Sequence, residues 1–132
     1  MGEISERCRG REANSKLRGI TMFGFHKKYY FIGSVRVVDG VVEDSRCWGF
    51  YTKKSKAIRA VEENWSDINE YGYYQYAVIE TVEEGLNNYD LHPMWFVQCR
   101  TLDRERDYYT TTYMKLNEAP NFSKDVCGWC IS

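Results

Sequence analysis

Five stretches of the chain have the apolar pattern of β-strands, and one has the period of an amphipathic helix. The longest apolar and β-branched stretch is Tyr73–Leu86. Val78 falls on one face of an extended strand, whereas Ala77 and Ile79 fall on the other. Because both faces carry apolar groups, we expect the central strand of a small sheet here, covered on both sides. Charged residues resume at Glu80, where this strand is expected to leave the core.

A hairpin is predicted on the N-terminal side of this strand. Valines alternate with polar residues towards the end of the stretch 23–38, which is the period of a half-buried strand. Asp39 and Gly40 follow, and this dipeptide supplies the positive φ values that a tight hairpin turn needs. The returning strand is expected over 41–51, where Gly49 indicates a bulge or a close packing contact.

The stretch 55–70 has the helical period, and Thr52 or Ser55 is the expected N-cap. Such a helix has one apolar stripe, which must pack on the sheet. The stripe consists of Ala57, Ile58, Val61, Trp65 and Ile68.

A second hairpin is predicted from strands at 94–102 and 108–116, joined by a charged turn. The remaining C-terminal residues are expected to pack along the domain as a tail. The order is therefore hairpin, helix, strand, hairpin and tail. This order predicts an α+β fold, an antiparallel sheet of about five strands with one amphipathic helix packed on a face.

The N-terminal residues 1–21 have no sustained period, so we expect a flexible, basic extension before a single α+β domain at 22–132. The 132-residue chain has a net charge of −1, which argues against nucleic-acid binding by bulk electrostatics. Residues 1–28 nevertheless carry seven Lys or Arg against three Glu, so a nucleic-acid contact through this arm stays open. No stretch has the ~18 apolar residues of a membrane span, and we expect a cytoplasmic protein without a membrane partner.

The five cysteines are irregularly placed and odd in number, which is unlike a secreted disulfide framework. Cys127 and Cys130 form a Cys-x-x-Cys pair around Trp129. Redox chemistry would need a helix N-terminus to lower a thiol pKa, and zinc would need two further ligands. We therefore expect two partly buried structural cysteines, with neither metal nor cofactor. The sequence has no nucleophile–base pair at motif spacing and no phosphate-binding glycine loop, so it offers no candidate catalytic residues and we do not expect an enzyme.

Aromatic residues make up 16% of the chain, which indicates either a compact aromatic core or an exposed contact surface. For a contact surface, the helix exit and the nearby loops are the expected place. The candidate residues are Asn64, Asp67, Tyr71, Tyr73, Tyr89 and Trp95. The alternative is that these rings close the core.

Three arginines, Arg100, Arg104 and Arg106, lie beside tyrosines in the second hairpin. This mixture could bind nucleic acid or a phosphorylated small molecule. Acidic residues alternate with the arginines and reduce the local charge, which favours an ordinary solvated turn.

Five short motifs follow one another between residues 49 and 96. They read GFYT (49–52), AIRAVEENWSDI (57–68), YQYAVIE (74–80), EGL (84–86) and WF (95–96). Their order and spacing resemble those of a group of small uncharacterised proteins from Firmicutes and their phages. The resemblance implies a small cytosolic accessory protein carried by a phage or mobile element, and it transfers no catalytic residue.

The leading hypothesis is a non-catalytic binding protein with a counter-defence or host-modulating function. It would bind a host or defence-system protein, or sequester a small nucleotide-like ligand. The alternative is a nucleic-acid-binding regulator that uses the basic arm and the Arg100–Arg106 hairpin, and a redox or metal function is a third. The open edges of such a sheet also suggest a homodimer.

Overall fold

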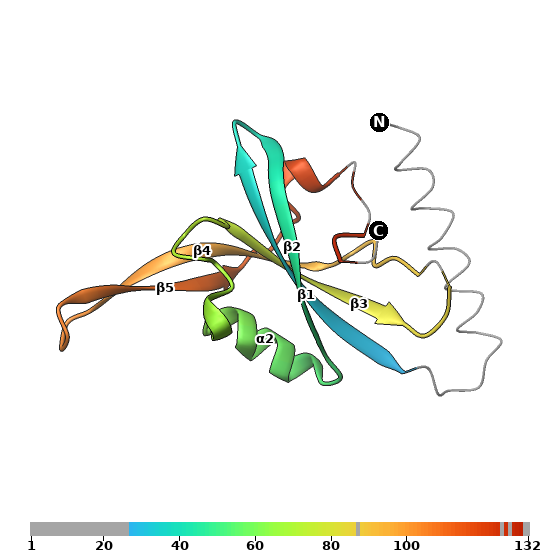
Figure 1. The fold of residues 1–132 in the computed structure, drawn as a ribbon, viewed down its shortest axis with the longest axis horizontal. Helices are drawn as coiled ribbons and strands as arrows, with labels where there is room; N and C mark the ends of the chain where they lie inside the picture. Colours follow the sequence, from blue (N-terminus) through green and yellow to red (C-terminus); the bar gives the residue numbers. More distant parts are fainter. Residues whose placement is uncertain (1–26, 87, 125, 127, 131–132) are drawn as a thin grey trace.

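The described residues, 27–86, 88–124, 126 and 128–130, form one five-stranded antiparallel sheet with an α-helix on a face (Figure 1). The structure is a computed structural model. It confirms the predicted α+β class, while the basic extension at 1–21 lies outside the described residues. The strands are β1 (Lys28–Val38), β2 (Val41–Tyr51), β3 (Tyr76–Glu83), β4 (Met94–Asp103) and β5 (Tyr108–Lys115). The helical elements are α2 (Lys54–Glu62), η1 (Trp65–Asp67) and η2 (Asn121–Ser123).

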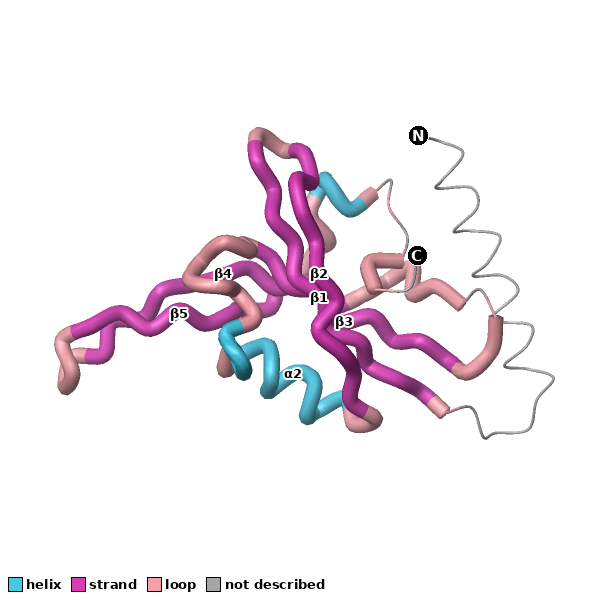
Figure 2. Tube along the Cα trace, in the orientation of Figure 1, coloured by secondary structure: helices cyan, strands magenta, loops and turns pink. Residues whose placement is uncertain are grey.

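The strand order is β2-β1-β3-β4-β5, so β3 is central, as predicted. β1 pairs with β3 from Lys28 to Val35, whereas β3 pairs with β4 only from Tyr76 to Ile79. Beyond this short seam the two hairpins, β1–β2 and β4–β5, extend in different directions (Figure 2). We call the β4–β5 hairpin the arm.

Turn chemistry explains the first hairpin. Asp39 and Gly40 adopt φ values of 53° and 77°, which suit a tight two-residue turn. Further along β2 the register skips one residue, because Ile32 pairs with Gly49 and the next residue of β1 pairs with Cys47. Trp48 is the extra residue of this bulge, as the glycine beside it predicted.

The helix packs on the sheet through a fully buried face, with Ala57 and Val61 both 0% exposed. It ends at Glu62, eight residues before the predicted end, because Asn64 adopts a left-handed conformation with φ 52°. Asparagine tolerates this conformation better than most residues, and it commonly stops helices. The predicted N-cap is also wrong, since Lys53 holds that position without a side-chain hydrogen bond.

The C-terminal tail covers the other face of the sheet, as expected. There Trp95 is buried, and the rings of Phe122 and Trp129 pack edge-on against it at 5.3 and 5.2 Å. The central strand thus has an apolar cluster on each face, one under the helix and one under the tail.

Glu80 does not mark the exit of β3 from the core, contrary to expectation, because it is only 2% exposed. The tail folds over it, and the Glu80 carboxylate accepts hydrogen bonds from the backbone N–H groups of Trp129 and Cys130 at 2.8–3.0 Å. Burial raises the pKa of this carboxyl above its usual value, although these hydrogen bonds act in the opposite direction.

Candidate functional site

The segment that connects α2 to β3, which we call the 63–75 loop, contains an unusual number of left-handed residues. Five of them are not glycine, and each costs of the order of 1–2 kcal/mol in this conformation, less for Asn and Asp. They are Asn64, Ser66, Asp67, Glu70 and Tyr71, with φ values between 48° and 57°. Surrounding contacts must therefore hold the loop in shape.

Part of the support comes from within the loop. The Asn64 side chain accepts a hydrogen bond from the Asn69 backbone N–H at 3.0 Å and donates one to the Asp67 carboxylate at 3.3 Å. The Asn69 side chain in turn accepts a bond from the Gly72 N–H at 3.3 Å. The predicted binding residues Asn64 and Asp67 thus stabilise the loop from inside.

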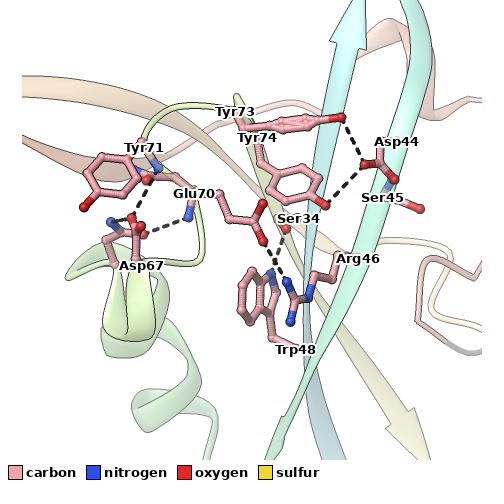
Figure 3. Close-up of polar contacts among 12 residues, drawn as sticks. Ser34, Asp44, Ser45, Arg46, Trp48, Asp67, Glu70, Tyr71, Tyr73 and Tyr74 are labelled. Carbon is pink, nitrogen blue, oxygen red and sulfur yellow. Dashed lines mark hydrogen bonds and ion pairs between the residues drawn. The ribbon is translucent and has the colours of Figure 1, made fainter.

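The rest of the support comes from β2. The Arg46 guanidinium lies 2.7 Å from the Glu70 carboxylate and stacks on the Trp48 ring, with Cζ 3.9 Å from the ring centroid (Figure 3). The Trp48 indole N–H donates to the Ser34 hydroxyl at 2.8 Å. Glu70 therefore fastens the loop to the bulge of β2.

A second attachment lies at Asp44. Its carboxylate accepts hydrogen bonds from the hydroxyls of Tyr73 at 3.1 Å and Tyr74 at 3.4 Å (Figure 3). Burial and the negative charge of the adjacent Asp44 raise the pKa of both tyrosine hydroxyls. Both hydroxyls therefore remain protonated donors at neutral pH. Arg36 adds a cation over the Tyr73 ring at 4.5 Å.

Tyr71 lies between these two attachments and is 99% exposed. Figure 3 shows its ring turned away from the Arg46–Glu70 pair and from Asp44. The ring is therefore available for contact on a loop whose backbone is held in place on both sides. Tyr71 is the predicted residue that the structure presents most openly to a partner.

An aromatic pocket of about 250 Å³ opens between β2, α2 and η1. The residues that line it are Ile32, Trp48, Gly49, Phe50, Tyr51, Ala60, Trp65, Ser66 and Ile68. Three of its rings lie within 6 Å of a cation, which is Arg46 for Trp48, Lys56 for Tyr51 and Arg59 for Trp65.

The other predicted site residues lie elsewhere. Tyr89 follows the C-terminal end of β3, whereas Tyr71 precedes its N-terminal end, so the strand separates them. Trp95 is 2% exposed and belongs to the core under the tail, so the expectation that it contributes to a contact surface is wrong.

The arginines Arg100, Arg104 and Arg106 are all exposed and lie on the arm. Arg106 donates to the Tyr108 hydroxyl at 3.1 Å, and Arg100 lies 6.0 Å from the centre of the Tyr109 ring. The arm thus brings the predicted cations and rings together on its outer part, whereas its base contacts the 63–75 loop through the hydrogen bond from the Tyr113 hydroxyl to the Tyr74 carbonyl at 2.7 Å (Figure 1).

Within the described part of the chain, no three His, Cys, Asp or Glu side chains are placed to hold a metal ion. Cys127 lies outside the described residues. The Cys130 thiol is partly buried, and burial and the neighbouring Cys47 side chain raise its pKa, which disfavours the thiolate. The helices of the described residues also include none with the length and apolarity to cross a membrane.

Comparison of the chain with protein-family models, with curated proteins and with solved structures finds no significant match. The resemblance to small proteins of Firmicutes and their phages therefore stays a prediction. The site rests on its geometry alone, and its β2 side, namely Asp44, Arg46 and Trp48, was not predicted from the sequence. The one signal there was the adjacent Trp48 and Gly49, which interrupt the alternation of β2.

Proposed function

We propose that the protein is a non-catalytic binding protein that acts by stoichiometric contact with another protein, centred on Tyr71. The observation that carries this proposal is the exposure of Tyr71 on a loop fixed by Glu70 on one side and Tyr73 on the other. Tyrosine is enriched among residues that dominate binding energy, because a rigid ring buries much area at low entropic cost.

The loop is suited to binding because its shape is set before a partner arrives. A preorganised surface loses less conformational entropy on association, which leaves more of the contact energy as affinity. The charged groups beneath Tyr71 satisfy one another, since Arg46 pairs with Glu70 and Asp44 accepts from tyrosine hydroxyls. These groups support a contact surface, and none is left over as an acid or base.

The biological context of the proposal is that of a small cytoplasmic accessory protein of a phage or mobile element. The resemblance between residues 49 and 96 supports this context. The partner would then be a host or defence-system protein, and the effect would be counter-defence or host modulation.

The test compares Tyr71→Ser with Tyr109→Ser, which removes a 61% exposed ring from the arm. Each tagged protein captures partners from cells of the native host, and affinity for a captured partner is then measured with purified components. We expect Tyr71→Ser to lose a partner that Tyr109→Ser retains, with the affinity reduced about 10-fold or more. Equal capture by both variants would refute the proposed contact.

The alternative function is that of a nucleic-acid-binding regulator, and the exposure of all three arginines on the arm favours it. The charge balance of the arm argues against this function, because Asp103, Glu105 and Asp107 alternate with the arginines. Contacts to phosphates would make the logarithm of the binding constant fall linearly with the logarithm of the salt concentration, with a slope of about −0.9 per phosphate on duplex DNA. Deletion of residues 1–21 and an Arg104→Ala/Arg106→Ala double variant would each reduce this slope.

A second copy of the chain is a further possible partner in this proposal. Within the described sheet, β2 and β5 each pair on one side only, so both edges offer free backbone groups. Sedimentation at several protein concentrations distinguishes a homodimer from a monomer.

A further inference from the structure

We infer that the aromatic pocket binds a small planar aromatic anion, in chemical terms a nucleobase-like ring that carries a phosphate. This inference deepens the proposed binding function and rests on it only in treating the protein as a binder. It concerns a different surface from the proposed protein contact, because Tyr71 does not line the pocket.

The size of the pocket suits a flat ring. An apolar protein cavity of about 150 Å³ holds benzene, so the roughly 250 Å³ here accommodates a larger one- or two-ring system. Its floor is apolar and buried, with Ile32 and Ile68 each 4% exposed and Ala60 3% exposed. Such a floor binds rings and leaves their polar edges facing the opening.

The walls of the pocket are fixed before a ligand enters. Trp48 is held by its bond to Ser34 and by the stacked Arg46. The Trp65 indole N–H donates to Glu63 at 3.2 Å, and its ring packs edge-on against Tyr51 at 6.1 Å. Stacking of a base on aromatic walls of this kind is tolerant of base identity.

The charge around the pocket selects an anion. Arg46, Lys56 and Arg59 each lie within 6 Å of a wall ring. Arg46 and Arg59 are paired with carboxylates, but within the described residues no carboxylate lies within ion-pair distance of Lys56. Lys53 and Lys54 lie close by in the sequence, and the first turn of α2 has no acidic residue. The Lys56 ammonium, 5.3 Å from the Tyr51 ring centroid, is therefore the cation beside the pocket that is left to pair with a phosphate.

Adenosine 5′-monophosphate and guanosine 5′-monophosphate are the probes, and quenching of tryptophan fluorescence is the measurement, with calorimetry as a second readout. We expect both nucleotides to bind, adenosine to bind about 10-fold more weakly, and inorganic phosphate to cause no quenching. No binding of either nucleotide at millimolar concentration would overturn the inference. Equal affinity for adenosine would overturn its electrostatic part.

Two variants test the location. Ala60→Leu fills the pocket from its floor, and Lys56→Glu reverses the unpaired charge, so each should weaken binding of adenosine 5′-monophosphate about 10-fold or more. Lys115→Glu, an exposed position on β5, is the matched control for charge. If Ala60→Leu fails to fold, as thermal unfolding would show, Lys56→Glu decides alone. Nucleotide binding unchanged in Lys56→Glu would overturn the site.

The Tyr71→Ser variant separates this inference from the proposed function. It should keep full nucleotide affinity while losing the protein partner. Loss of partner capture without loss of nucleotide binding therefore supports both sites, and the failure of either site leaves the result for the other unchanged.

Discussion

Replacement of Glu80 by alanine should release the C-terminal tail from the sheet. The carboxylate accepts hydrogen bonds from two backbone donors, the N–H groups of Trp129 and Cys130. A hydrogen bond to a charged group contributes roughly 1.5–3 kcal/mol, so two donors give about 3–6 kcal/mol at most. The tail of the variant can move into water and rehydrate its N–H groups. Because the cost of burying the charge offsets part of this gain, we expect Glu80→Ala to lower the free energy of unfolding by about 1–3 kcal/mol.

Urea unfolding at neutral pH measures this loss, and hydrogen exchange of the Trp129 amide reports on the tail itself. The exchange should accelerate in Glu80→Ala far more than that of amides in β1. Glu83→Ala, a substitution three residues further along the same strand, is the control and should change stability little. If the Trp129 amide stays protected in Glu80→Ala, the carboxylate does not hold the tail.

The pH dependence of stability gives a second test of the same contact. Burial raises the pKa of Glu80 in the folded state above its ordinary value of 4.5. The folded state therefore binds the proton more tightly than the unfolded state, and protonation of this group stabilises the fold. The wild type should gain stability relative to Glu80→Gln as the pH falls through the folded pKa, and the gain should level off below about 4.5. A difference that shrinks on acidification would contradict this reasoning.

Two further predictions concern the loop and the tail. Ser66→Gly, at φ 57°, should raise the free energy of unfolding by about 0.5 kcal/mol, because glycine removes the strain of the left-handed conformation. Ser55→Gly within α2 should instead lower it by about 0.5–1 kcal/mol. A change in stability of the same sign in both variants, measured by thermal unfolding, would refute the assigned strain. Treatment with the thiol oxidant diamide, which takes up two electrons and two protons, should join Cys47 to Cys130 as a disulfide, because the two side chains are neighbours. Peptide mapping should show Cys99 still reduced, and a disulfide that instead includes Cys99 would contradict the placement of the tail.

The strands were predictable because their signals are local. The alternation of valines in β1 and the Asp39–Gly40 turn depend on neighbouring residues only, and the structure has both the strand and the turn, although β1 is not half-buried there, since Ser34 is as fully buried as Val35. The length of the helix was not predictable from the sequence. The apolar stripe continues to Ile68, whereas the left-handed conformation of Asn64 ends α2 at Glu62. Ile68 is still buried, since the 3-10 turn carries it back to the sheet.

The site was predictable only on its loop side. The sequence places Tyr71 and Tyr73 after a helix, where exposed rings are plausible contact residues. Their supports come from β2, at sequence separations of 24 from Arg46 to Glu70 and 29 from Asp44 to Tyr73. Pairings at this distance depend on how the β1–β2 hairpin twists over the loop, and no local pattern encodes that geometry. The burial of Glu80 has the same origin, because a tail 50 residues away covers it.

The short seam between β3 and β4 has a mechanical consequence. The strand pairs from Tyr76 to Ile79, with one further bond from the Gln98 N–H to the Gln75 carbonyl, join the arm's first strand to the centre, whereas β1–β3 and β4–β5 are paired along most of their length. Under a pulling force applied at the tip of the arm, the hydrogen bonds between β3 and β4 would break first. Separation of the β4–β5 hairpin would also remove Phe96 and Tyr113 from the core under α2, so the helix would lose part of its packing.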